Sequence, residues 1–430
     1  MLKSLTLLLL LLLGALQGKI QVEGTGDGKN TPIARTLCAI KGLLQAVESI
    51  NTPEMNPHFR NMVEEIERLN MSTLPERLFS QQTIPPYSEG EWKAKQESLK
   101  DKFTTFAGDE VSIKFVGGYP QARLANERIA KLLARAQRVL AEIGRVKQDE
   151  MTKVRAAKEW ARKALFATNE TAASTKSFAQ TIEKGCGQTS VNTHPGANAG
   201  MSLVNDFVCL CGKGTSTRDG KACTDGRAAI GAGTDWSAES NALSDWGHIK
   251  TLCVDEAPVR VSSQEIRAAI QTYAAFVNGD PGTAKKGLVV GFSNSDDGFC
   301  GANAHTACVS YPNVGQTNRG TDADATKPPY IEWAVNGVKA ADYLDEAREE
   351  ATKIPPLAGR LEMAVGRAWE IYERLLAEGV LDTTARDSTP SKEPNGTRTP
   401  PSAAPAASNH PRDGVTKSIT PSAVMWIWAG

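Results

Sequence analysis

Cysteine is the residue whose number and spacing point most directly to a chemistry in this chain. Its eight cysteines could either form disulfides or hold zinc. The tightest grouping, Cys209-Leu-Cys211 followed by Cys223, matches no standard pair of zinc-ligand spacings. An even number of cysteines in an exported chain is typical of disulfides, and the N-terminus described below indicates export. The sequence therefore favours disulfides over a metal, at Cys38, Cys186, Cys209, Cys211, Cys223, Cys253, Cys300 and Cys308.

Spacing constrains the pairing of these cysteines only in part. Cys209 and Cys211 are separated by one residue, so the geometry of a disulfide makes a bond between them improbable. Each is expected to have a distant partner, and Cys223 and Cys253 are the available candidates.

The four cysteines not yet assigned suggest two further disulfide pairs. Cys300 and Cys308 are close enough to close a small loop, which leaves Cys38 and Cys186. A bond between these last two would connect the first predicted helix to the end of a long helix described below. Sequence alone does not determine any of these connectivities.

No constellation of catalytic or cofactor-binding side chains is present. The chain lacks a nucleophile elbow, a Walker A loop and an H-E-x-x-H motif. Ser293-Asn-Ser-Asp-Asp-Gly298 distantly resembles a calcium loop, but it begins with serine and has Ala304 at the twelfth position, so we interpret it as a polar turn. We therefore predict no enzyme, cofactor or metal site. The histidines have no ligand spacing; they are His58, His194, His248, His305 and His410.

One long helix is predicted from Leu124 to Thr168. The stretch holds no proline and one glycine, and at about 1.5 Å per residue it would be roughly 68 Å long. A helix of this length needs partners along its surface. Its apolar residues recur at steps of three and four, as in a coiled coil, at Ile129, Leu132, Ala136, Val139, Ile143 and Val146, and again at Met151, Val154, Ala161 and Leu165.

The partners are predicted on both sides of a cysteine-bearing insertion. Leu357–Leu375 carries apolar residues in steps of four and three, and Leu37–Ile50 has helical spacing as well. Between them, residues 185–329 are rich in glycine and hold seven of the eight cysteines. We therefore expect a mainly α fold, an elongated antiparallel coiled-coil bundle of long helices with a disulfide-bonded, loop-rich insertion forming a lobe. Two separate helical domains are the alternative.

The charge composition and the N-terminal residues limit which functions the chain can have. Balanced charge, with 49 basic and 49 acidic residues, gives no global field to hold nucleic acid. Residues 1–18 have the layout of a signal peptide, with Lys3 before an apolar run that is too short for a membrane span. We therefore predict passage through the secretory pathway, and an ectodomain over residues 19–381.

The C-terminal region is predicted to be a linker followed by a lipid-attachment signal. Residues 382–413 are rich in Thr, Ser, Pro and Ala without apolar periodicity. Residues 414–430 end in an apolar stretch, the layout of a GPI-attachment signal with Asp413 as attachment residue, although the apolar end is short. A disordered tail that happens to end in apolar residues is the alternative. Sequons at Asn70, Asn169 and Asn395 fit the same compartment.

One segment within the insertion carries a family resemblance. Leu203-Val-Asn-Asp-Phe-Val-Cys-Leu-Cys211, followed by Lys221-Ala-Cys223 and Leu252-Cys253, comes after a long alanine-rich helix that is itself preceded by Cys38. This arrangement resembles the B-type N-terminal domain of the variant surface glycoproteins of African trypanosomes. Many members have a cysteine-rich C-terminal domain, whereas this chain has no cysteine after Cys308. The resemblance implies the B-type cysteine framework at Cys186, Cys209, Cys211, Cys223 and Cys253.

The resemblance also implies a function. Such a protein would be a GPI-anchored coat glycoprotein on the outer face of the plasma membrane, without catalytic activity. It would form a dense protective layer and take part in antigenic variation and evasion of host antibody. Its expected partners are further copies of itself in a homodimer or homotrimer, neighbouring copies in the coat, host antibodies and the membrane. A surface receptor for a host serum glycoprotein, a haemoglobin complex or transferrin, is the alternative on the same scaffold.

Overall fold

The computed structural model divides the chain into two units, Met1–Glu378 and Gly379–Gly430, and the fold described here is that of the first. The predicted signal peptide, the sequon at Asn395 and the attachment residue Asp413 lie outside the described residues. The structure describes residues 28–187, 195–213, 220–224, 230, 235–253, 260–277, 288–293, 300, 306–313 and 329–387.

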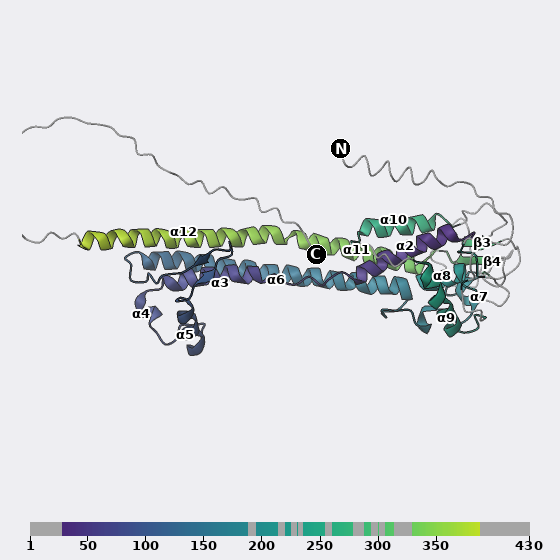
Figure 1. Ribbon diagram of the computed structural model, residues 1–430, viewed down its shortest axis with the longest axis horizontal. Coiled ribbons are helices and arrows are strands. Elements are labelled where there is room, and N and C mark those ends of the chain that lie inside the picture. The colour runs from purple at the N-terminus through teal and green to yellow at the C-terminus, as the bar shows by residue number, and fades with distance from the viewer. Residues whose placement is uncertain are drawn as a thin grey trace, which may run out of the picture. The chain divides into compact units, whose positions relative to one another are not determined.

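Helix α6 (Ala122–Phe166) is the longest element, with 45 residues (Figure 1). It confirms the long helix that apolar periodicity predicts, displaced by two residues at each end. The helix ends at Ala167, which adopts the left-handed conformation at φ 59°. In its last third, half of the buried positions are alanines, which allow neighbouring helices to approach closely, at Ala157, Ala161 and Ala164.

The long helices α11 (Glu332–Thr352) and α12 (Ile354–Asp387) return along α6 in the antiparallel direction (Figure 1). They are separated at Lys353, because α12 restarts with two prolines in its first turn, where the missing N–H costs nothing. The antiparallel bundle is therefore confirmed. Helix α12 extends to Asp387 and so includes the first residues of the predicted linker, which begins at residue 382.

Two hydrophobic clusters lie along this bundle. The first, which we call the lobe core, combines side chains of α2 (Thr31–Glu48), the last third of α6 and α11 with the elements of the insertion. The second, the shaft core, combines α3 (Pro57–Ser72), the first half of α6 and α12. Short elements join the shaft core: α4 (Glu76–Phe79), α5 (Glu89–Ser98) and an antiparallel pair β1 (Phe103–Thr104) and β2 (Glu110–Val111).

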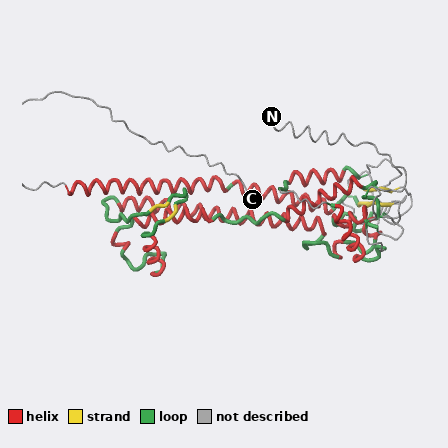
Figure 2. Tube along the Cα trace, viewed as in Figure 1, coloured by secondary structure: helices red, strands yellow, loops and turns green. Residues whose placement is uncertain are grey.

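The insertion contains more regular structure than its sequence suggests (Figure 2). Strands β3 (Leu288–Ser293) and β4 (Thr306–Tyr311) pair antiparallel with Leu288 opposite Tyr311. Every residue of α8 (Leu203–Cys211) is buried, so this helix has no polar face and no apolar periodicity to detect. The remaining elements are η1 (Thr175–Ser177), α7 (Ile182–Cys186), α9 (Glu239–Ile249), η2 (Lys250–Leu252) and α10 (Ser263–Ala274).

Candidate functional site

Four disulfides hold the lobe core together. Cys209 and Cys211, at the end of α8, are bonded to Cys186 and Cys223, respectively, with Cα–Cα distances of 5.5 and 5.3 Å. This helix is therefore fixed covalently to α7 on one side and to the segment around residue 223 on the other. The remaining bonds are Cys38–Cys253 and Cys300–Cys308.

The predicted bond between Cys38 and Cys186 is wrong. Cys38, in α2, is bonded instead to Cys253, which immediately follows η2. Cys186 ends α7, and α7 packs on α8, where Cys209 lies. These partners depend on which short helices pack together, and spacing along the chain carries no information about that.

A buried carboxylate lies at the centre of the lobe core. Asp206 Oδ2 accepts hydrogen bonds from the Tyr311 hydroxyl at 2.7 Å and from Trp333 Nε1 at 2.8 Å. Its Oδ1 accepts from the Gly200 backbone N–H at 3.0 Å and from Asn205 Nδ2 at 3.3 Å. The carboxylate therefore connects α8 to β4, to α11 and to the turn before α8.

Burial raises the pKa of Asp206 to about 6, and the hydrogen bonds donated to its carboxylate limit the rise. Tyr311 also shares a 2.6 Å hydrogen bond with the Tyr273 hydroxyl of α10. The side chain of Asp206 has no exposed surface, so a substrate could not reach it. Its chemistry is structural, because it satisfies donors from several elements at once.

The buried side-chain amide of Asn30, at the N-terminus of α2, also links several segments of the lobe core by hydrogen bonds. Asn30 Nδ2 donates to the carbonyl oxygens of Leu210 and Ala307 at 3.0 and 2.7 Å. Its Oδ1 accepts from the Phe292 N–H at 2.9 Å. Sequence reasoning assigned no role to Asn30 or Asp206. The only signal for Asp206 is its position as the one charged residue of α8, a segment in which Asn205 is the only other polar side chain apart from the cysteines.

A groove runs along the shaft between α6 and α12. It consists of two adjoining hollows of about 400 and 340 Å³ that share Leu132, Arg135 and Arg367. Its apolar lining includes Leu124 and Met363, which are 45% and 59% exposed. Leu124 lies in the first hollow and Met363 in the second, so each part of the groove has one exposed large apolar side chain.

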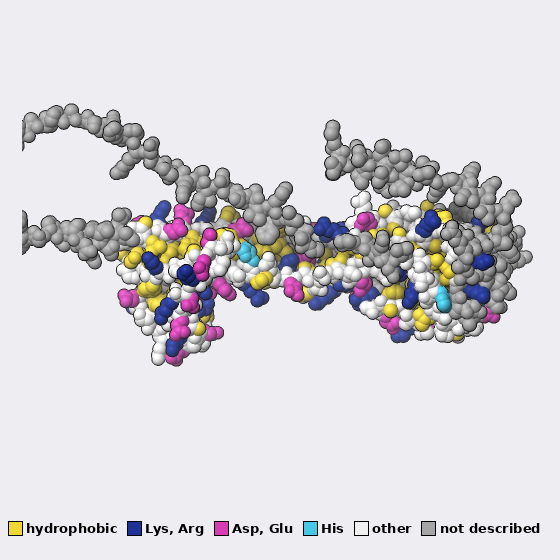
Figure 3. All heavy atoms as spheres, viewed as in Figure 1, with side chains coloured by type: hydrophobic (Ala, Val, Ile, Leu, Met, Phe, Trp, Pro, Cys, Tyr) yellow, Lys and Arg dark blue, Asp and Glu magenta, His cyan; other side chains and the backbone are white. Residues whose placement is uncertain are grey.

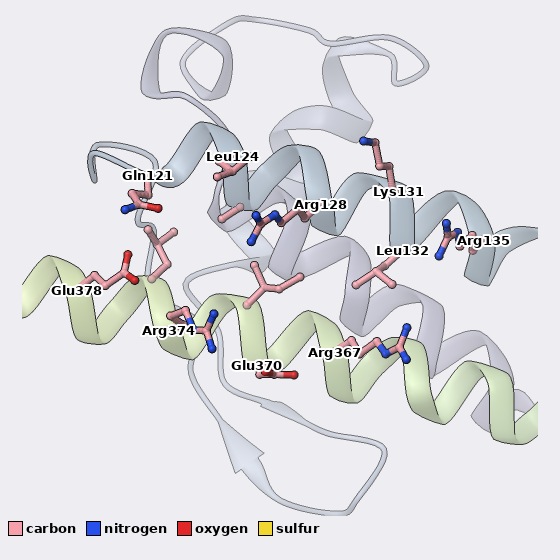
Figure 4. A pocket seen from close by; sticks show the side chains of 13 residues that line it. Gln121, Leu124, Arg128, Lys131, Leu132, Arg135, Arg367, Glu370, Arg374 and Glu378 are labelled. Carbon is pink, nitrogen blue, oxygen red and sulfur yellow. The ribbon is translucent and has the colours of Figure 1, made fainter.

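Charged side chains border this groove on both helices. In Figure 4, Arg128 and Arg135 of α6 lie opposite Arg367 and Arg374 of α12. Within the part of the chain that the structure describes, none of these four arginines forms an ion pair. Elsewhere on the face shown in Figure 3, basic and acidic side chains alternate without a large patch of one sign.

The two predicted glycosylation sites that the structure describes lie in different surroundings. The Asn70 side-chain and backbone oxygens accept hydrogen bonds from Asn126 Nδ2 at 3.1 and 2.7 Å, and Ser72 of the same sequon is buried. Asn169 lies exposed in the loop that follows α6. Asn169 therefore presents the more accessible acceptor.

Two classes of site find no candidate among the described residues. That part of the chain holds no group of three or more His, Cys, Asp or Glu side chains placed to hold a metal ion. None of its helices has both the length and the apolar composition that a membrane span requires. The features open to interpretation are therefore the cystine-bonded lobe core, the groove and the exposed sequon.

Comparison with known proteins gives two matches. The family model described as the trypanosomal VSG domain matches residues 8–363. Variant surface glycoprotein YnAT 1.3 of Trypanosoma congolense is 26% identical over 247 residues, which cover 53% of this chain and 54% of that protein. The chain thus aligns with about half the length of this curated relative.

Proposed function

The chain belongs to the trypanosomal variant surface glycoproteins, a family of cell-surface coat proteins, and on that premise we propose that it is a GPI-anchored member of a dense protective coat. In this role it takes part in antigenic variation and in evasion of host antibody. Its contribution is steric, since a layer of packed copies keeps antibodies from the membrane beneath.

The distance along α6 between the lobe and the part of α12 around Leu375 is the observation that supports this proposal. The lobe core contains the end of α6, around Phe166, whereas Leu375 of α12 lies beside Leu124 at the start of the same helix. The two points are separated by almost the whole of a helix about 68 Å long. A chain attached to the membrane beyond α12 would therefore hold its lobe far from the lipid.

Mass spectrometry of the C-terminal peptide tests the anchor. Intact cells are treated with a phosphatidylinositol-specific phospholipase C, and the released protein is digested. We expect a terminal peptide that ends at or near Asp413 and carries a glycolipid remnant. A peptide that ends at Gly430 would refute the anchor.

Binding and abundance test the coat role itself. A coat protein must be present in enough copies to cover the membrane, and its ectodomain should have no single host ligand. Labelled serum glycoproteins are therefore added to the purified ectodomain, and surface copies are counted. A sparse protein with a saturable complex to one serum glycoprotein would be a receptor, and the coat proposal would fail.

We further propose that the α6–α12 groove is the interface with a second copy in a homo-oligomer. Along α12, Arg367, Glu370, Arg374 and Glu378 alternate in sign around the groove (Figure 4). In two parallel copies related by a two-fold axis along the shaft, each arginine would face a glutamate one turn away on its partner. The exposed apolar lining of the groove would be covered at the same time.

Substituting an exposed groove residue tests this interface without disturbing the monomer. Met363→Glu places a charge in the groove, whereas Val335→Glu does so at a half-exposed apolar position of α11 outside it. Sedimentation of the full chain should give an oligomer for the wild type and for Val335→Glu, and a monomer for Met363→Glu. A monomeric wild type, or equal behaviour of the two variants, would disprove the interface.

A further inference from the structure

A surface cavity of about 480 Å³ lies over the lobe core, remote from the groove. Apolar side chains from the end of α6, from α8 and from α9 line it, among them Phe166, Val204 and Trp246. Polar side chains at its border come from α2 and from the segment after α9, among them Gln45 and Lys250. Polar and apolar groups contribute about equally to its surface, and a cavity of this size with such a mixed lining suits a small molecule that has both polar and apolar faces.

The sequon Asn169-Glu170-Thr171 lies at the border of this cavity. Thr171 is one of the lining residues, and Asn169 is exposed two positions before it. Two residues span at most about 7 Å, so the backbone of Asn169 is close to the cavity, while its side-chain amide donates a hydrogen bond to Glu159 of α6. The left-handed conformation of Ala167 ends α6 and turns the chain so that these residues follow its last turn.

The chemistry of the cavity suits a sugar. A pyranose ring has an apolar face of C–H groups and an edge of hydroxyl groups. The rings of Phe166 and Trp246 are 6% exposed each, so each offers a narrow apolar edge to such a face. Gln45, Lys250 and Thr251 can exchange hydrogen bonds with the hydroxyl and acetamido groups.

We infer that the N-linked glycan on Asn169 folds back across Thr171 and that its first N-acetylhexosamine residues occupy this cavity. The glycan then covers the exposed edge of Trp246 and the rim of the cavity between α2, α6 and α9. The inference rests on passage through the secretory pathway, which belongs to the proposed function, but it does not depend on the anchor or on the coat. Failure of the phospholipase experiment would therefore leave it standing.

Hydrogen exchange with and without the glycan tests the inference. The full chain is produced in eukaryotic cells, and mass spectrometry of the Asn169 peptide establishes occupancy. One sample is treated with peptide N-glycosidase F, and another with an endoglycosidase that leaves one sugar on the asparagine. We expect amide exchange in α9 to rise about tenfold after complete removal, the factor that a loss of about 1.4 kcal/mol produces. The sample that keeps one sugar should show a smaller rise.

A variant that fills the cavity supplies the second measurement. Gly247 lines the cavity, and a Cβ added there meets no atom within 4 Å, so Gly247→Trp can be accommodated on α9. We expect the indole to displace the glycan, which makes exchange in α9 insensitive to deglycosylation and makes the glycan easier to cleave. Gly366→Trp on α12, where a Cβ also meets nothing within 4 Å, is the matched control and should behave as the wild type.

Several outcomes would overturn the inference. An unoccupied Asn169 would do so, as would an occupied Asn169 whose removal leaves α9 exchange unchanged. Equal cleavage of the glycan in the Gly247→Trp and Gly366→Trp variants would also contradict it, because a glycan free in solvent gains nothing from a filled cavity. Protection of α9 that persists after deglycosylation would indicate a different occupant and would equally count against the inference.

Discussion

Asp206 should make the stability of the lobe depend on pH in the direction opposite to that of an ordinary carboxylate. Its pKa is raised by burial from 3.8 to about 6, so the folded lobe takes up a proton at a higher pH than the unfolded chain does. Between these two values the folded state binds more protons. The contribution of this group to the free energy of unfolding therefore rises as the pH falls.

The size of the effect follows from the pKa. A tenfold change in proton affinity is worth about 1.4 kcal/mol, so the whole rise from 3.8 to about 6 corresponds to about 3 kcal/mol. As the pH falls from about 7.5 to about 5, the contribution of Asp206 to the free energy of unfolding grows by about 1.4 kcal/mol, which is about half of this total. The protonated carboxyl of Asp206 still has a partner, since the Tyr311 hydroxyl oxygen can accept a hydrogen bond from the carboxyl O–H while it donates its own to Tyr273.

The variant Asp206→Asn removes this titration. The amide of this variant would have an NH₂ group where the carboxylate now accepts hydrogen bonds, so one of the buried donors around it would lose its acceptor. At about pH 7.5 we therefore expect the free energy of unfolding to fall by about 1–3 kcal/mol. The informative quantity is the change of that loss with pH. As the pH falls to about 5, the difference in free energy of unfolding between wild type and variant should increase by about a further 1.4 kcal/mol, because only the wild type gains from protonation of Asp206. Urea unfolding at each pH, followed through hydrogen exchange of α8 peptides, measures the stability of the lobe itself.

Asp345→Asn is the matched control for this experiment. A hydrogen bond from Ser263, together with Arg267, lowers the pKa of Asp345. Its stabilising effect is complete above pH 3.8 and is lost only at lower pH, so its removal should leave the slope between about pH 7.5 and about pH 5 unchanged. A gap that stays constant or narrows in the Asp206→Asn variant would refute the reasoning.

Two further predictions concern the disulfides and the shaft. Replacing Cys38 and Cys253 together with Ala opens a connection of 215 residues, which by loop entropy costs up to about 5 kcal/mol, whereas opening Cys300–Cys308, with a separation of 8, costs about 2.5 kcal/mol. Thermal unfolding should order the two variants accordingly, and the reverse order would contradict the loop-entropy account. In the shaft core, Glu65 accepts hydrogen bonds from the Phe106 N–H and from Trp369 Nε1, so Glu65→Gln should lower the free energy of unfolding by about 1–3 kcal/mol. Glu64→Gln, at the exposed neighbouring position, should change it little, and equal losses would show that the buried acceptor is unimportant.

The parts of the fold that could be predicted are those with local, repeated patterns. Apolar residues at steps of three and four place α6 within two residues of its bounds, and Pro355-Pro356 indicates the break between α11 and α12. A long helix that buries one side must show its period in the sequence, because its other side meets water. Strong periodicity therefore predicts the shaft and the direction of the return.

The interior of the lobe could not be predicted in the same way. Helix α8 and strand β4 are buried on every side, so neither has an alternation between polar and apolar residues. The disulfide partner of Cys38 and the donors around Asp206 come from segments far along the chain, and only tertiary packing brings them together. The resemblance of the segment around Cys209 identified the right family, but it did not indicate what these side chains contact.

The different construction of shaft and lobe bears on the proposed coat role. In the shaft, burial along a 45-residue helix is distributed over many similar contacts, and every disulfide lies elsewhere. The short elements of the lobe are below the length at which isolated helices are stable in water, so they depend on cystines and on buried groups such as Asp206 and Asn30. Those connections are all internal. Side chains on the outside of such a lobe can change without touching any of them, which is the property that a surface exposed to selection by antibodies needs. A fixed internal frame and an exterior that is free to vary, as the proposed coat role requires, therefore fall on different residues of one chain.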